Sequence, residues 1–193
     1  AREILEPLGM EDTAFQVSDD QLPRFAACYE RDGNGLRLQD APADSPYRTP
    51  PDLLSGGGGL VSTAQDYVRF CQMLLGNGAL DGHRLLGRKT MELLRLNHLP
   101  TGGDLTSMGQ PVFSETRYDG IGFGLGFSVL LDPARAQIAG SPGELAWGGM
   151  ASTAFWVDPH EDLAVVFMTQ LLPSSSYPLR RELRTLVHAA IVD

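Results

Sequence analysis

The stretch that most constrains the fold is the second half of the chain, where apolar residues recur at strand spacing. Over residues 120–127 glycine alternates with a large apolar residue. This period of two predicts one strand, whose bare face would let another layer approach closely. Two more apolar runs, 153–157 and 163–169, are joined by a connection short enough for a hairpin, 158–162. Consecutive strands with a short connection predict an antiparallel sheet.

Helical spacing dominates two stretches before these strands. Ser62 is expected to cap a helix that runs to Leu75, and Gln65 completes a capping box. Gly76 then stands where a C′ residue is expected. A second helix is predicted over residues 88–96.

The two ends of the chain also have helical character. Residues 1–8 predict the last turn of a helix that Pro7 terminates. Residues 179–192 predict an amphipathic helix. Its apolar stripe comprises Leu183, Leu186, Val187, Ala190 and Ile191, opposite Arg180, Arg181, Glu182 and Arg184. Helices, then strands, then a packing helix predict one α+β domain over 1–193, with an antiparallel sheet flanked by helices.

Two segments are predicted to be loops. Residues 39–59 are rich in Pro, Asp and Gly and end in four consecutive glycines. Residues 97–119 lack periodicity, and a long loop of this kind is often functional. We expect the second loop to help shape substrate choice, although no residue in it can be assigned.

The bulk properties exclude several classes of partner. The 193 residues carry a formal charge of −9, so no basic stripe is present to bind nucleic acid or an anionic membrane surface. The longest purely apolar run, 163–168, is too short to span a membrane. Cys28 and Cys71 are far apart, and the 4 histidines lack ligand spacing, so neither metal nor cofactor is expected. The compartment, bacterial cytoplasm or periplasm, stays undecided.

Familiar phosphate-binding and nucleophile motifs do not fit. No lysine follows the glycines at 56–59, so a phosphate-binding loop fails. The glycines at 120–126 do not satisfy G-x-G-x-x-G, and 140–143 lacks the spacing of a G-x-S-x-G nucleophile elbow.

A resemblance to a known family extends over most of the chain. The segments that carry it are EPLGMEDTAF (6–15), GGGGLVSTAQDYVRFCQMLLGNGALDGHRLL (56–86), GFGLGF (122–127) and WGGMASTAFWVDPHEDLAVVFMTQ (147–170). In this order they resemble the C-terminal half of the serine β-lactamase-related family, which groups class C β-lactamases, family VIII carboxylesterases and D-alanyl-D-alanine peptidases. The resemblance implies a partial β-lactamase/transpeptidase-like fold that lacks its N-terminal strands and nucleophile helix.

In that family a serine of Ser-x-x-Lys attacks a carbonyl, and the lysine and a Tyr-x-Asn/Ser tyrosine handle the proton. Both motifs lie upstream of the segment that 6–15 resembles. Lys89, the single lysine, is preceded three residues earlier by Leu86, and none of the 5 tyrosines begins Tyr-x-Asn/Ser. The nucleophile and its base are therefore missing from this sequence.

The third family motif reads Lys-Thr-Gly in lactamases and His-x-Gly or Trp-Gly-Gly in many esterases. It matches Trp147, Gly148 and Gly149, which the resemblance makes substrate-binding. It implies that the backbone N–H of Met150 is one oxyanion-hole donor, the other being the N–H of the absent serine. Spacing alone allows another interpretation, in which the two glycines form a β-bulge and Trp147 is core. Tryptophan in place of lysine favours esters over β-lactams, because no cation pairs with the β-lactam carboxylate.

Other conspicuous residues have structural interpretations. We expect Ser62 to be a helix cap and Tyr29 to pack against a helix. Trp156 is expected to point into the core from a strand, and Asp158 and Asp162 to shape a turn rather than bind metal.

Two functions follow. In the first, the chain is the C-terminal part of a serine hydrolase, a carboxylesterase or β-lactamase-like enzyme acting by acyl-serine transfer on a small ester or amide, inactive alone. In the second, it is a non-catalytic binding or assembly module that keeps the fold. In either case strand 163–169 is expected to present a bare apolar edge, which would recruit a second copy or a companion N-terminal fragment.

Overall fold

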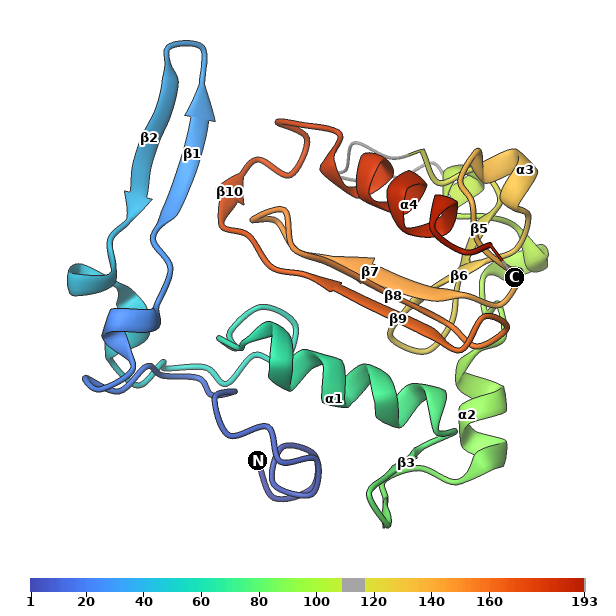
Figure 1. Cartoon of the computed structure of the whole chain (residues 1–193), viewed down its shortest axis with the longest axis horizontal. Coiled ribbons are helices and arrows are strands. Elements are labelled where there is room, and N and C mark those ends of the chain that lie inside the picture. Colours follow the sequence, from blue (N-terminus) through green and yellow to red (C-terminus); the bar gives the residue numbers. More distant parts are fainter. Residues whose placement is uncertain (109–116, 193) are drawn as a thin grey trace.

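A five-stranded antiparallel sheet forms the centre of the molecule, in the order β5-β6-β7-β8-β9. The computed structural model describes residues 1–108 and 117–192. The strands are β5 (Ile121–Phe123), β6 (Ser128–Leu130), β7 (Leu145–Gly148), β8 (Ala154–Asp158) and β9 (Leu163–Phe167). Helix α1 (Ala64–Leu75) and helix α4 (Leu179–Ala189) lie on opposite sides of this sheet (Figure 1). The predicted α+β fold with a helix-flanked antiparallel sheet is confirmed.

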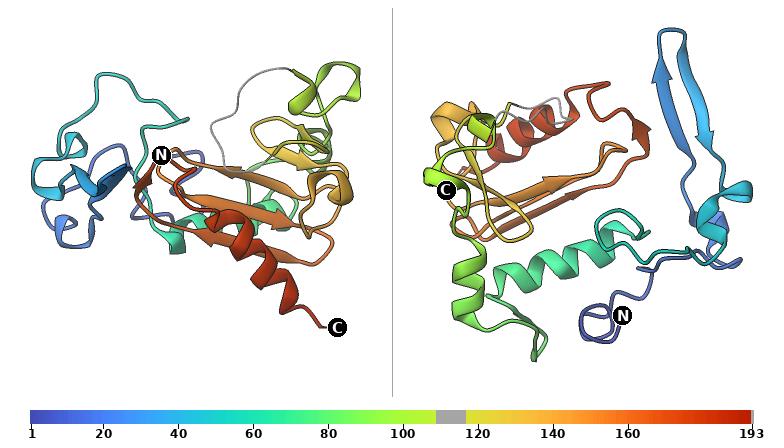
Figure 2. Two further views of the ribbon diagram at one scale, coloured as in Figure 1. Left: turned by 90° about the horizontal axis from the view of Figure 1, so that it is seen from above. Right: turned by 180° about the vertical axis from the view of Figure 1, so that it is seen from behind.

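Smaller elements surround this unit. Strands β1 (Cys28–Asp32) and β2 (Gly35–Asp40) form a hairpin that stands to one side of the sheet (Figure 2). Strand β1 also pairs in parallel with β10 (Leu171–Leu172). The remaining elements are β3 (Ala79–Leu80), β4 (His83–Arg84), α2 (Arg88–Leu94) and α3 (Pro133–Ala136).

The main core lies between α1 and the sheet. Cys71 and Leu74 of α1 meet Leu145 of β7 and Val157 of β8, and all four are at most 1% exposed. Trp156, 1% exposed, points to the α4 side of the same strand. The predicted inward orientation of Trp156 is therefore confirmed.

Helix α1 has the predicted extent but a different cap. Thr63 is the N-cap, and its hydroxyl accepts the Asp66 N–H at 3.2 Å. Ser62 stands one residue too early to reach that N–H, and its hydroxyl bonds Thr13 at 2.8 Å instead. Gly76 is the C-cap with φ −69°, rather than a left-handed C′ residue. A side chain at Gly76 would collide with the Ala79 carbonyl, which explains the glycine.

The prediction of a single strand over residues 120–127 is wrong, because the chain turns back within this segment. Strand β5 ends at Phe123, Gly126 has φ +99°, and β6 begins at Ser128. A Cβ at Gly124 would collide with the Leu94 carbonyl. The glycines thus mark a turn and a close approach, not one bare strand face.

The hairpin predicted from the third apolar run is confirmed. Strands β8 and β9 pair in register from Ala154↔Phe167 to Asp158↔Leu163. Asp158 shapes the turn as expected, since its Oδ1 accepts the His160 N–H at 2.9 Å.

Three predictions in the first half need correction. Residues 1–8 form hydrogen-bonded turns rather than a helix end, and Pro7, which has no N–H, cannot continue a helical ladder. Helix α2 ends at Leu94 rather than at residue 96. Tyr29 lies in strand β1, is 42% exposed and pairs with Leu171, so it does not pack against a helix.

The predicted loops contain only short elements apart from the end of β2. Residues 39–59 include the 3-10 turns Pro42–Asp44 and Pro46–Arg48. Residues 97–119 include Pro100–Gly102 and Thr106–Met108, while 109–116 lie outside the described residues.

Helix α4 packs through a face that only partly matches the prediction: Leu183 and Val187 of the predicted stripe are half-buried, but Arg180 is half-buried as well. Arg184 is 9% exposed, whereas Leu186 of the predicted apolar stripe is 70% exposed. Arg184 turns inward because it pairs with Glu144 at 2.6 Å and lies over the Trp156 ring at 4.6 Å. In the described part of the chain, no helix combines the length and apolar character needed to cross a membrane.

Candidate active site at the end of strand β7

The predicted site residues lie where β7 ends. Gly148 is the last residue of β7, and Gly149 and Met150 begin the turn that leads to β8. The pairing of β7 with β8 is regular through Gly148↔Ala154. The two glycines therefore close a strand and open a turn, and they do not interrupt the ladder as a bulge would.

Trp147 is at the surface rather than in the core. Its side chain is 40% exposed, and its ring packs edge-on against Phe123 with centroids 5.2 Å apart. The centroid of the Tyr118 ring lies 6.5 Å from that of Trp147. A half-exposed aromatic ring supported by two others offers a firm apolar surface.

The turn after β7 is held at several points. The Gly149 N–H donates to the Thr153 carbonyl at 3.0 Å, and the Ser152 N–H donates to the Gly149 carbonyl at 3.2 Å. The Ser152 hydroxyl donates to the Leu171 carbonyl at 2.6 Å, which ties the turn to β10. The Met150 side chain is 75% exposed. Among the described residues the Met150 N–H has no hydrogen-bond acceptor.

Contacts within this chain explain why residues 148 and 149 are both glycine. A Cβ at Gly148 would lie 2.7 Å from the guanidinium carbon of Arg180 and 2.9 Å from the Thr153 carbonyl oxygen. A Cβ at Gly149 would collide with the Thr153 hydroxyl. From the sequence, the two glycines were expected to leave room for a substrate. In the structure, close packing against Arg180 and Thr153 already requires glycine at both positions.

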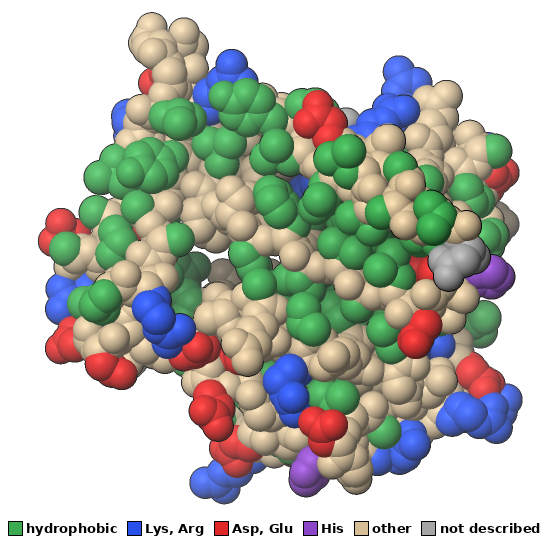
Figure 3. Space-filling model, viewed as in Figure 1, with side chains coloured by type: hydrophobic (Ala, Val, Ile, Leu, Met, Phe, Trp, Pro, Cys, Tyr) green, Lys and Arg blue, Asp and Glu red, His purple; other side chains and the backbone are tan. Residues whose placement is uncertain are grey.

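A pocket of about 70 Å³ borders this strand end. It lies on the α4 side of the sheet, and its lining includes Ser128, Ala146, Gly148, Trp156, Arg180 and Arg184. Figure 3 shows hydrophobic side chains exposed across the face of the molecule that Figure 1 presents. The pocket lining therefore combines apolar surface with three guanidinium groups, those of Arg117, Arg180 and Arg184.

The cysteines and Ser62 are unsuited to act as nucleophiles. Cys71 is 0% exposed, and burial raises the pKa of its thiol to about 12. Burial also raises the pKa of the Cys28 thiol. The Ser62 hydroxyl is engaged with Thr13 just before α1. A thiol of high pKa is protonated at neutral pH and is a poor nucleophile.

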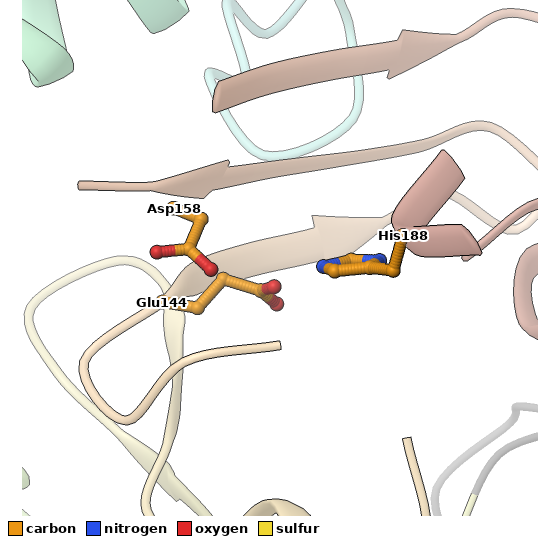
Figure 4. A group of neighbouring side chains, drawn as sticks. All are labelled: Glu144, Asp158 and His188. Atoms are coloured by element: carbon orange, nitrogen blue, oxygen red, sulfur yellow. The ribbon is translucent and has the colours of Figure 1, made fainter. Parts of the chain in front are cut away.

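Three possible metal ligands meet below α4 (Figure 4). Glu144, Asp158 and His188 each bring a ligand atom within 4.8 Å of the others. Both Glu144 oxygens already bind Arg184, at 2.6 Å and 2.9 Å. Asp158 accepts the Ser141 N–H at 3.1 Å and the His160 N–H at 2.9 Å. Burial raises the pKa of Glu144, which Arg184 opposes. Both carboxylates are therefore engaged, Glu144 by an ion pair and Asp158 by backbone N–H groups, and the guanidinium beside Glu144 disfavours a cation.

The antiparallel sheet, its flanking helices and the Trp-Gly-Gly strand end define a protein of the serine β-lactamase-related class. The chain belongs to the Beta-lactamase family, whose model matches residues 1–189.

Curated relatives include proteins of two bacterial genera. The Mycobacterium tuberculosis protein Rv1367c is 39% identical over 177 residues, which cover 90% of this chain and 43% of that protein. Esterase EstB of Burkholderia gladioli is 29% identical over 202 residues, which cover 96% of this chain and 47% of the esterase. The chain thus spans about half the length of the curated relatives it matches.

Solved structures share the fold over the same extent. An unliganded selenomethionyl form of simvastatin synthase (LovD) from Aspergillus terreus has a TM-score of 0.77 and 26% identity, covering 97% of this chain and 48% of that one. EstCE1, a hydrolase with promiscuous acyltransferase activity, has a TM-score of 0.75 at 24% identity, covering 97% and 49%.

Sequence patterns missed the group that contacts this strand end most closely. Arg180 was expected on the exposed side of its helix, yet it reaches Gly149 and Thr153. Its spacing from Arg184, four residues on, was the available signal, since residues i and i+4 share one helix face.

Proposed function

We propose that this chain forms one wall of the active site of a serine hydrolase that cleaves carboxylic esters through an acyl-serine intermediate. The observation that carries the proposal is the Met150 N–H, which has no acceptor among the described residues and lies in a braced turn at the Trp-Gly-Gly strand end. Membership of the Beta-lactamase family and the likeness to Esterase EstB support it. The attacking serine, its lysine and the tyrosine are assigned to residues outside this sequence.

The reaction follows from these assignments. The serine oxygen attacks the ester carbon while the base takes its proton, and the carbonyl oxygen becomes an oxyanion. The Met150 N–H and the N–H of the serine stabilise that charge. Collapse of the intermediate expels the alcohol, which receives the proton, and water then hydrolyses the acyl-serine. Trp147 is a neutral aromatic surface beside the reacting carbonyl, which favours esters over β-lactams. No metal or cofactor is needed for these steps.

We also propose that β9 pairs with a strand from outside these residues, or with a second copy. Within the described residues β9 pairs only with β8. The opposite edge of the sheet is covered, since the N–H groups of Leu105 and His98 donate to β5 carbonyls, each at 2.8 Å. An apolar strand edge left open in this way tends to recruit another strand.

The test compares the 193-residue chain with the complete encoded protein. The complete protein should hydrolyse a chromogenic short-chain ester and react with a fluorophosphonate at one serine, whereas the chain alone should not react. Met150→Pro, which removes the N–H, should lower kcat by about 10²–10³-fold. Met150→Ala, which keeps the N–H, is the matched control and should retain kcat. Stoichiometric labelling of the chain alone, or full activity of Met150→Pro, would contradict the proposal.

One observation favours the alternative of a non-catalytic binding or assembly module: neither Ser-x-x-Lys nor Tyr-x-Asn/Ser occurs in the sequence. The reading frame upstream of Ala1 distinguishes the two functions. Both motifs there support the enzyme, and a start codon adjacent to Ala1 supports the module.

A further inference from the structure

Arg180 joins the first turn of α4 to the turn that carries Met150. Its Nη2 donates to the Gly149 carbonyl at 2.7 Å and to the Thr153 carbonyl at 2.9 Å. These carbonyls stand on either side of the segment from Met150 to Ser152. One guanidinium nitrogen therefore clamps both ends of the turn.

The absence of a side chain at the end of β7 makes room for this guanidinium. Arg180 packs directly over Gly148, where a Cβ would be 2.7 Å from both its Cζ and its Nη2. Any larger residue at 148 would displace the side chain. The side chain also lines the pocket beside Gly148 and Trp156.

The first of these hydrogen bonds bears on the proposed oxyanion donor through covalent geometry. The carbonyl of Gly149 and the N–H of Met150 belong to the same peptide group, which is planar and trans. In a trans peptide the C=O and N–H point in opposite directions. Because Arg180 holds the carbonyl, the Met150 N–H is directed away from the Arg180 guanidinium.

We infer that Arg180 is a positioning residue for the Met150 N–H, and this inference rests on the function proposed above. Its guanidinium holds the Gly149–Met150 peptide in one orientation, so the donor is in place before the oxyanion forms. Prior orientation of this kind matters because a small misplacement of a reacting group lowers the rate strongly. Arg180 touches neither substrate nor reacting atoms in this role.

The kinetic test is made in the complete protein. Arg180→Ala should lower kcat about 10- to 100-fold with little change in KM, because the lost effect is realised in the transition state. Active sites are counted by fluorophosphonate titration, so a smaller folded fraction does not enter kcat. Arg181→Ala, one residue along the same helix and exposed, is the matched control and should retain kcat.

A double variant separates positioning from general loss of structure. If Arg180 acts through the Met150 N–H, Arg180→Ala should lower kcat no further in a Met150→Pro background. Free guanidinium ion, at concentrations too low to unfold the protein, should restore part of the activity of Arg180→Ala. Additive losses of kcat in the double variant would overturn the inference.

The same variants in the 193-residue chain give a readout that needs no turnover. Arg180→Ala should shift the Met150 amide resonance and speed its hydrogen exchange, and Arg181→Ala should do neither. An unchanged Met150 amide in Arg180→Ala overturns the inference. If Met150→Pro lowers kcat and Arg180→Ala does not, the inference fails alone. If Met150→Pro leaves kcat unchanged, the proposed function fails, and the amide measurement still decides whether Arg180 orients the peptide.

Discussion

Two buried carboxylates of this molecule, Glu144 and Asp104, are each paired with an arginine. Arg184 and Glu144 have side chains 10% and 1% exposed, and they meet in a bidentate pair beneath α4. The Trp156 ring lies against the guanidinium, 4.6 Å from its carbon. A buried pair of this kind is costly to break from one side, because the remaining charge has no partner and no water.

Asp104 has a comparable role in the long loop before β5. Its carboxylate accepts N–H groups from Gly120 at 3.0 Å and Ser107 at 2.9 Å, and Arg135 binds it at 2.7 Å. The hydrogen bond from Gly120, followed by that from Ser107, holds the pKa of Asp104 below its usual range. Hydrogen bonds to the ionised form have this effect.

A pH dependence follows from that shift. Because the folded-state pKa is lowered, ionised Asp104 stabilises the fold above its unfolded pKa of about 3.9, and this contribution is lost as the pH falls through the folded value. Asp104→Asn should therefore destabilise the chain at pH 7 and lose less stability on acidification than wild type. Urea unfolding from pH 2 to 7 measures both effects. Asp19→Asn, at an 89% exposed side chain, is the control and should follow the wild-type curve.

At the scale of elements, local capping chemistry decides where α1 begins. Thr63 and Ser62 are both suitable caps by residue type, but only Thr63 stands three residues before Asp66 N–H, which its hydroxyl accepts. The Asp66 carboxylate in turn accepts the Thr13 hydroxyl at 2.7 Å and the Asp12 N–H at 2.8 Å. The first turn of α1 is thereby joined to the segment around Thr13.

Removing the Thr63 cap should lower the stability of the fold measurably. Thr63→Ala should lower the free energy of unfolding by about 1 kcal/mol, because the Asp66 N–H loses its side-chain acceptor. Thr185→Ala, an exposed hydroxyl within α4, is the control and should change stability by less than about 0.5 kcal/mol. Denaturant unfolding followed by circular dichroism compares the two. A loss at Thr63 no larger than at Thr185 would argue against this cap.

Helix α4 shows which features amphipathic periodicity predicts and which it does not. The pattern correctly predicts a helix, and it starts at Leu179 as expected. It predicts the packing face only in part, since Leu183 and Val187 are half-buried whereas Leu186 is exposed and Arg184 is buried. Periodicity ranks side chains by hydrophobicity, whereas the helix orientation also depends on the buried carboxylate of Glu144, which Arg184 pairs with.

For the whole molecule, the open edge of β9 predicts association. Beyond β9 the sheet continues no further within the described residues, although all five β9 residues are half-buried. We expect the 193-residue chain to form concentration-dependent oligomers in sedimentation velocity experiments. Val165→Lys should weaken association by about tenfold or more, because a charged edge strand disfavours pairing.

The hairpin offers a matched control. Leu38→Lys places the same charge on β2, another edge strand, where Leu38 is 49% exposed. Association should persist in this variant, and thermal unfolding of both variants shows that they remain folded. A monodisperse wild-type monomer at all concentrations would contradict association through β9.

The sequence by itself determined α1, the β8–β9 hairpin and, through ordered motifs, the family. These features depend on hydrogen bonding and periodicity over a few neighbouring residues. Only the tertiary structure decided that residues 120–127 turn back, that the packed face of α4 includes Arg184, and that Arg180 donates a hydrogen bond to the Gly149 carbonyl. The physical reason is separation along the chain: Arg184 and Glu144 are 40 residues apart, and Arg180 and Gly149 are 31 apart. Where a charge or a peptide finds its partner is decided by packing, which no local pattern encodes.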